Sequence, residues 1–282
     1  METKIIKFDS TKLFIDSQEI LNSILNGDSL EIMRKMSDKS IDLIITSPPY
    51  NLLNSTGNGL KKNTKTGKWK NAAIKNGYEE YEDNMPYEKY IYWQRECVSE
   101  MCRIVKDDGA IFYNNKNRVQ NGLLQDRGEI VRGFPLRQII TWKRSGAINF
   151  NPGYFLPTTE QIYLICKKPF KLVKGANKFT DVWEITQEMK NPHPAPFPEA
   201  LIDRIISSTE GKIILDPFAG SGTTGVSAQK FRRNFILIDK SEKYCRMMQA
   251  RLRGEDWKKN ENEKFEISKK SILNEIIKFK GP

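Results

Sequence analysis

Residues 44–51 read IITSPPYN and combine side chains and carbonyls that could hold a small polar substrate. Pro48 and Pro49 have no backbone N–H and a fixed φ, and each disfavours helix at the residue before it. The apolar run at 41–46 is therefore expected to be a strand that ends in a stiff, extended turn. Ser47 and Tyr50 would project from that turn. Taken alone, the segment is also compatible with an ordinary loop after a strand.

A second candidate site lies at residues 213–224, IILDPFAGSGTT. An apolar strand ends at Asp216, and the turn Gly220-Ser221-Gly222 leads into a helix. In open α/β sheets ligands bind at the carboxyl ends of the strands, where glycines permit close approach and a helix start offers free N–H groups. A phosphate-binding P-loop would need lysine after the second glycine, and Thr223 stands there instead.

A third polar residue, Asp239, follows the apolar run 234–238 and lies 23 residues after Asp216. An acid at about this spacing can accept hydrogen bonds from the two hydroxyls of a bound ribose. Either acid alone could be a helix N-cap. Together with the glycine-rich turn, they favour a nucleoside-type cofactor.

The elements that would position these residues alternate along the chain. Hydrophobic spacing predicts helices at 18–25, 29–36, 87–105, 198–208, 222–231 and 241–252. Short apolar runs predict strands at 41–46, 110–113, 139–142, 161–166, 212–215 and 234–238. This alternation indicates an α/β fold with a mostly parallel sheet.

Composition narrows the class of protein. The 282 residues are 38% hydrophobic and 29% charged, as in globular proteins, and no run is long and apolar enough to span a membrane. The first residues lack a secretory signal, and the four cysteines have no metal-ligand spacing, so we expect reduced thiols in a cytoplasmic protein. The net charge of +11 suggests a nucleic-acid partner.

The chain has a single histidine, His193, in a proline-rich segment. A Ser-His-Asp hydrolase would have to use it, and a histidine-rich metal site is excluded. We therefore expect a reaction that needs neither a histidine acid–base step nor a metal.

Residues 216–224, DPFAGSGTT, resemble the S-adenosylmethionine motif of amino-directed DNA methyltransferases. Residues 46–50, TSPPY, resemble their catalytic motif, Asp/Asn/Ser-Pro-Pro followed by an aromatic residue. Because the catalytic motif comes first, the chain is similar to the permuted β group, over about residues 25–253. The resemblance implies a Rossmann-like methyltransferase fold with helices on both faces of the sheet, and S-adenosyl-L-methionine as cofactor.

The resemblance also assigns roles. The catalytic residues would be Ser47, Pro48, Pro49 and Tyr50. The cofactor-binding residues would be Asp28, Thr46, Phe197, Asp216, Pro217, Phe218, Gly220, Ser221, Gly222, Thr223 and Asp239. Asp28 would lie near the adenine and Phe197 near the methionine end. Leu237 stands where the group commonly has glycine.

An exocyclic amine is a poor nucleophile because its lone pair is delocalised into the ring. Two acceptors, Ser47 Oγ and the Pro48 carbonyl, could draw its hydrogens and favour a more pyramidal nitrogen. Tyr50 could stack on a base extruded from the duplex. In the family that the chain resembles, the serine form of the motif is associated more with cytosine N4 than with adenine N6, although a serine hydroxyl could accept from either amine. Other possibilities are a methyltransferase for RNA or protein amides and a non-catalytic DNA-binding protein.

The DNA surface is expected in loops. Residues 61–75 contain six lysines and no acid, and could hold phosphates, with Trp69 as a wedge; a solvated flexible loop is the alternative. The candidate contacts are Lys61, Lys62, Lys65, Lys68, Trp69, Lys70, Lys143 and Arg144.

The expected organisation is a methyltransferase domain at 1–254, with DNA-contacting insertions at about 52–80 and 167–192, and a charged tail at 255–282. The expected partner is double-stranded DNA, with a cognate restriction endonuclease acting as a separate protein. The sequence leaves monomer and homodimer open.

Overall fold

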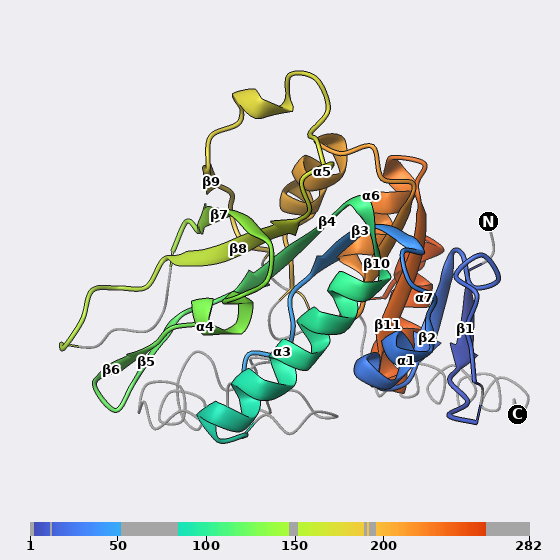
Figure 1. Ribbon diagram of the computed structural model, residues 1–282, viewed down its shortest axis with the longest axis horizontal. Coiled ribbons are helices and arrows are strands. Elements are labelled where there is room, and N and C mark those ends of the chain that lie inside the picture. Colours follow the sequence, from blue (N-terminus) through green and yellow to red (C-terminus); the bar gives the residue numbers. More distant parts are fainter. Residues whose placement is uncertain are drawn as a thin grey trace, which may run out of the picture.

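The computed structural model describes residues 3–11, 13–51, 84–146, 152–188, 191 and 196–257 (Figure 1). Its strands are β1 (Lys4–Lys7), β2 (Ser23–Asn26), β3 (Ile41–Thr46), β4 (Val105–Asn115), β5 (Arg118–Gln120), β6 (Leu123–Gln125), β7 (Leu136–Lys143), β8 (Thr159–Cys166), β9 (Val182–Glu184), β10 (Ile213–Asp216) and β11 (Asn234–Asp239). Its helices are α1 (Ser29–Lys35), α3 (Tyr87–Ile104), α4 (Gly128–Val131), α5 (Glu199–Ser207), α6 (Thr223–Lys230) and α7 (Glu242–Leu252), with one 3₁₀ turn at Ala176–Lys178.

Nine of these strands form one sheet in the order β1-β2-β11-β10-β3-β4-β8-β7-β9. All neighbouring pairs from β1 to β4 are parallel, whereas β8 runs antiparallel to both β4 and β7. The sheet is therefore mostly parallel, as predicted. Its carboxyl edge gathers the ends of β2, β11, β10, β3 and β4, together with the beginning of β8.

Helices cover both faces of the sheet, which confirms the predicted fold class. One core joins α1, α3 and α4 to strand residues such as Ile41 and Ile44. The other joins α5, α6 and α7 to Leu43 and Ile45. Because β3 is buried on both faces, its residues from Leu43 to Ile45 are all apolar rather than alternating.

The predicted helix at 18–25 is wrong. Residues 17–22 form turns, and Ser23–Asn26 form β2, which pairs with β1 on one side and β11 on the other. Asn22 takes a positive φ of 57°, and its N–H donates to the carbonyl of Phe235 at 2.7 Å. A short apolar run is compatible with either a buried helix or a buried strand, and here the pairing partners decide it.

The region 167–192, expected as a loop insertion, also contains regular structure. β9 pairs in parallel with β7 at the edge of the sheet. At the opposite edge, the start of the described chain meets its last helix, where Gln249 of α7 donates to the carbonyl of Thr3 at 2.9 Å. Across the described ranges, the helices are too short or too polar to cross a membrane.

Candidate active site

The Ser-Pro-Pro-Tyr turn leaves the sheet where predicted, because β3 ends at Thr46. Ser47 is half-buried, while the two prolines and Tyr50 are buried. Ser47 Oγ lies 2.5 Å from the Tyr50 hydroxyl. From α3, the hydroxyl of Tyr90 donates to the Pro49 carbonyl at 3.0 Å. The turn is thus fixed by contacts with both its own side chains and a neighbouring helix.

Asp216 connects this turn to the glycine-rich segment. Its side chain is 2% exposed, and it accepts hydrogen bonds from the hydroxyls of Thr46 at 2.8 Å and Thr224 at 2.6 Å. It also accepts from the backbone N–H of Phe218 at 3.1 Å. One buried carboxylate therefore joins the end of β3 to the first turn of α6.

Burial raises the pKa of Asp216 to about 6, although its three hydrogen bonds oppose the shift. Between about pH 4 and pH 6 the folded chain therefore holds a proton that the unfolded chain releases. The stabilisation that the folded chain gains from holding this proton is complete below the pKa of Asp216 in the unfolded chain. It is lost as the pH rises through about 6, the pKa of Asp216 in the folded chain. We expect the free energy of unfolding of the wild type, relative to Asp216→Asn, to fall by about 2 kcal/mol between pH 4 and pH 7.

Urea unfolding without cofactor measures this difference. Asp107→Asn is the matched control, since hydrogen bonds from Lys167 and Lys39 lower the pKa of Asp107 to about 2. Its contribution is present above the unfolded pKa and is lost as the pH falls from about 4 to 2. If the free energies of unfolding of the wild type and Asp216→Asn differed by the same amount at every pH from 4 to 7, the raised pKa of Asp216 would be contradicted.

The glycine-rich turn after β10 has a backbone that only glycine accommodates well. Gly220 and Gly222 have φ of 51° and 76°. A Cβ on Gly222 would also lie 2.8 Å from Cγ of Met248. Arg251 of α7 supports the turn by donating to the carbonyl of Ser221 and the hydroxyl of Thr223, both at 3.0 Å.

Asp239 lies beside this turn at the end of β11. One carboxylate oxygen accepts from the N–H of Gly220 at 2.9 Å, and the other from the N–H of Ser241 at 2.8 Å. The N–H of Gly27, after β2, donates to the Asp239 carbonyl at 3.1 Å. Three turns at neighbouring strand ends are therefore hydrogen-bonded to one another.

The remaining predicted cofactor residues surround the same turns. Asp28 caps α1 by accepting from the N–H of Leu30 at 3.0 Å, and the hydroxyl of Ser29 donates to the Pro217 carbonyl. The Phe197 carbonyl accepts from Thr223 at 3.3 Å. The structure thus brings together the eleven residues that the resemblance assigned to the cofactor.

Leu237 occupies the position where glycine was expected, and it is fully buried. Its side chain belongs to the core formed with α5, α6 and α7. A Cβ on Gly225 would lie only 2.7 Å from Leu237 Cδ1. The larger residue at 237 is accommodated because α6 has a glycine opposite it.

Sequence reasoning missed the side chains behind Tyr50. Asn114, at the end of β4, donates to the Tyr50 hydroxyl at 2.6 Å and to Glu160 Oε2 at 2.9 Å. Tyr50 in turn lies 3.1 Å from the same Glu160 oxygen. Two consecutive asparagines after an apolar strand were the available signal for Asn114 and Asn115, because polar residues at strand carboxyl ends often line a site.

The predicted DNA contacts divide into two groups. Lys61, Lys62, Lys65, Lys68, Trp69 and Lys70 lie outside the described residues, as does His193. Lys143 is half-exposed and pairs with Glu184 at 2.8 Å. Arg144 is mostly buried, donates to the Pro157 carbonyl at 2.8 Å and lies 3.5 Å from Glu160 Oε1. Arg144 therefore lies mainly in the interior, beside Glu160.

Two further cationic side chains, Lys116 and Arg118, lie close to the Ser-Pro-Pro-Tyr turn. Burial and the nearby Arg144 lower the pKa of Lys116, just after β4, to about 8, although Glu160 opposes the shift. Arg118 donates to the Asn51 carbonyl at 2.5 Å, directly after the Ser-Pro-Pro-Tyr turn. The carboxyl edge beside Ser47 therefore carries a local excess of positive charge.

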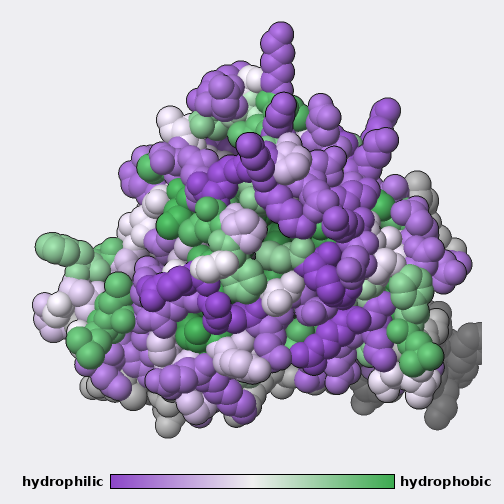
Figure 2. Space-filling model, viewed as in Figure 1, coloured by the Kyte–Doolittle hydropathy of each residue, from purple (hydrophilic) through white to green (hydrophobic). Residues whose placement is uncertain are grey.

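The molecular surface in this view is mostly hydrophilic, with apolar side chains gathered near its centre and at the left end (Figure 2). Figure 1 places the β5–β6 hairpin and the β7–β8 connection at that end. The exposed apolar residues of these segments include Leu123, Leu124 and Phe155.

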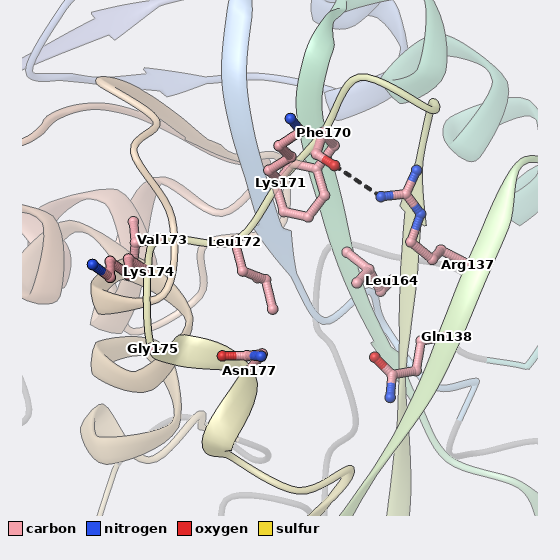
Figure 3. Close-up of a pocket in the computed structure, with 10 residues that line it drawn as sticks. All are labelled: Arg137, Gln138, Leu164, Phe170, Lys171, Leu172, Val173, Lys174, Gly175 and Asn177. Atoms are coloured by element: carbon pink, nitrogen blue, oxygen red, sulfur yellow. Dashed lines mark hydrogen bonds between the residues drawn. The ribbon is translucent and has the colours of Figure 1, made fainter.

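A shallow pocket lies on the flank of the sheet, between β7, β8 and residues 170–177 (Figure 3). Its volume is about 520 Å³ and its polar lining includes Arg137, Gln138 and Asn177. It contains none of the carboxyl-edge residues described above. In the ranges that the structure describes, no cluster of three or more His, Cys, Asp or Glu side chains could hold a metal ion.

Comparison with known proteins identifies the family. The N6/N4 methyltransferase family model, described as DNA methylase, matches residues 41–250, well over half of the chain. The chain belongs to this DNA methylase family. It is therefore a DNA methyltransferase that uses S-adenosyl-L-methionine as the methyl donor.

Individual relatives agree with this assignment. The Type II methyltransferase M.HpaI of Haemophilus parainfluenzae is 30% identical over 82% of this chain and 74% of its own length. The Type II methyltransferase M2.DpnII of Streptococcus pneumoniae is 30% identical over 87% of this chain and 94% of its own.

Solved structures confirm the fold of the methylase. The cytosine-N4-specific PvuII DNA methyltransferase superposes with a TM-score of 0.62 and 20% identity, over 81% of this chain and 84% of that one. A DNA modification methylase of Thermus thermophilus, TTHA0409, solved with S-adenosyl-L-methionine, gives a TM-score of 0.58 and 20% identity, over 81% of this chain and 93% of that one.

Proposed function

We propose that this DNA methyltransferase is site-specific and methylates the N4 amine of cytosine in double-stranded DNA, after the base leaves the helix. The observation that carries the proposal is the contact between its two motifs. Through Asp216, the end of β3 and the start of the glycine-rich turn are held within one buried hydrogen-bonded unit. A donor bound at the turn would therefore lie beside Ser47.

The residues present fit a nucleoside cofactor. The glycine-rich turn at Gly220–Gly222 packs so closely on Met248 that Gly222 has no room for a Cβ, and the N–H of Gly220 holds the turn against Asp239 at the end of β11. We assign Asp239 to the ribose hydroxyls, Asp28 to the adenine end and Phe197 to the methionine end. When bound, the cofactor supplies an activated methyl group.

The chain's own task is then to hold and orient the amine, since methyl transfer from a sulfonium mainly requires a nucleophile positioned in line and at short range. Ser47 Oγ and the Pro48 carbonyl accept its two hydrogens and favour a pyramidal nitrogen. Tyr90 and Asp216 hold the turn from two sides, which limits the movement of both acceptors. The Tyr50 ring contacts the extruded base.

The serine at the head of the motif supports cytosine rather than adenine, and so does the fold similarity to the cytosine-N4-specific PvuII enzyme. The lysine-rich segment 61–75, with Lys143 and the cations beside Ser47, would bind the phosphates. The Type II relatives support a companion endonuclease that acts as a separate protein.

Nucleoside analysis tests the proposal. The protein is incubated with labelled S-adenosyl-L-methionine and mixed duplex DNA, the DNA is digested, and the nucleosides are separated. We expect label in N4-methylcytosine. Label in N6-methyladenine would overturn the choice of base. Label transferred to RNA or to protein in parallel incubations, but not to duplex DNA, would overturn the substrate.

A further inference from the structure

A chain of hydrogen-bonded side chains leads from Ser47 into the interior of the protein. Ser47 Oγ lies 2.5 Å from the Tyr50 hydroxyl, which lies 3.1 Å from Glu160 Oε2. Asn114 donates to both Tyr50 and Glu160, at 2.6 and 2.9 Å. Tyr50, Asn114 and Glu160 are 6%, 1% and 6% exposed, so little water competes for these groups.

The antiparallel direction of β8 creates this arrangement. In a fully parallel sheet, the residue that begins a strand would lie at the opposite edge from the catalytic turn. Because β8 runs against β4, its first residues lie beside Asn114 and Asn115, which end β4 (Figure 1). Glu160 therefore reaches the carboxyl edge from the beginning of its strand.

The hydrogens in this chain can be assigned from donor and acceptor capacity. An ionised carboxylate only accepts, so the amide nitrogen of Asn114 must face Glu160. The Tyr50 hydroxyl has one hydrogen and two acceptor lone pairs. If it donates to Glu160 and accepts from Asn114 and Ser47, all three of its sites are used.

In this arrangement Ser47 donates its own hydrogen to Tyr50, and its remaining lone pairs are directed away from Tyr50. If Tyr50 donated to Ser47 instead, the Ser47 hydrogen would be available to the substrate and could compete for the amine lone pair. The negative charge at the end of the chain decides between these two arrangements. Arg144, 3.5 Å from Glu160 Oε1, supplies the opposite charge that a buried carboxylate requires.

We propose that Glu160 is a positioning residue that, through Tyr50, keeps Ser47 an acceptor toward the target amine and receives the proton that methylation releases. The proposal rests on the proposed function, in which Ser47 contacts the amine. Methyl transfer gives the amine nitrogen a new N–C bond in exchange for the S–C bond of the donor, and leaves it with one excess proton. That proton passes to Ser47, the Ser47 proton to Tyr50 and the Tyr50 proton to Glu160, which becomes a neutral acid until solvent removes the proton.

The first test uses two near-isosteric variants. Glu160→Gln removes the charge, and Tyr50→Phe keeps the ring but removes the hydroxyl. We expect each variant to lower kcat about 10- to 100-fold, which is no more than the loss caused by removing a direct acid–base group. The KM values for cofactor and DNA should change less than about 2-fold. Glu242→Gln, which removes an exposed pair with Arg246, should match the wild type.

The second test separates polarity from mere packing. Ser47→Asn places an amide carbonyl at the acceptor position, and a carbonyl accepts whatever the state of Tyr50. Adding Glu160→Gln to Ser47→Asn should therefore cost less than about 3-fold in kcat. Equal losses in the two backgrounds, or near-normal kcat for Glu160→Gln alone, would overturn the proposal. Absence of cytosine methylation by the wild type would instead count against the proposed function.

Discussion

Replacing Ser47 by alanine is expected to lower the rate of methyl transfer by at least about 100-fold, in the range observed when one acid–base or oxyanion-type contact is removed. The substitution deletes one of the two acceptors proposed to hold the amine. The smaller side chain fits the same turn, and the bonds from Tyr90 to Pro49 and from Thr46 to Asp216 do not involve it. Cofactor affinity should therefore stay within about 2-fold of the wild type.

Single-turnover methylation with the enzyme in excess over duplex DNA measures the rate, and calorimetry measures cofactor affinity. Ser207→Ala is the matched control, because Ser207 is exposed at the end of α5 and bonds only locally, to the Arg204 carbonyl. Near-normal turnover of Ser47→Ala would remove Ser47 from the acceptor role.

Replacing Asp239 by alanine should weaken cofactor binding by at least about 100-fold. The carboxylate would accept from two ribose hydroxyls, and each hydrogen bond to a charged group contributes about 1.5–3 kcal/mol. The loss should exceed that of Asp239→Asn, whose amide oxygen still accepts. Calorimetric titration with S-adenosyl-L-methionine gives both affinities.

Asp239 also accepts from Gly220 and Ser241, so part of any effect could come from a displaced turn. Thermal unfolding without cofactor measures that part separately. The control is Asp38→Ala, which removes an exposed carboxylate paired with Arg103 on the amino side of β3. Unchanged affinity in Asp239→Ala would exclude Asp239 from the cofactor site.

Four strands of the parallel half, β3, β4, β10 and β11, were predictable because each is an apolar run followed by a polar or glycine-rich turn. Thr46, Asp216 and Asp239 end such strands, and adjacent parallel strands place their ends at one edge. These three residues could therefore be predicted to lie at one edge without knowing the pairing. The strand β2 could not be predicted from the sequence, because its four residues fit a helix as well as a strand until β1 and β11 are in place.

Glu160 could not be predicted for a different reason. It begins a strand, and the rule that ligands bind at carboxyl ends excludes such a position. Only the antiparallel pairing of β8 with β4 brings it to Tyr50. The role of Arg251 could not be predicted either, since its contact with the Ser221 turn depends on how α7 packs against α6.

The contact between Gln249 and the carbonyl of Thr3 has a topological consequence. Because Thr3, at the start of the described chain, contacts α7, its last helix, a linker from the end of α7 back to residue 3 would close the methylase into a ring. Opening that ring between residues 51 and 84 would give a chain in which the cofactor motif precedes the catalytic one, with every strand pairing kept. The order of the two motifs is thus a property of where the polypeptide is interrupted, and the active edge itself has no first or last motif.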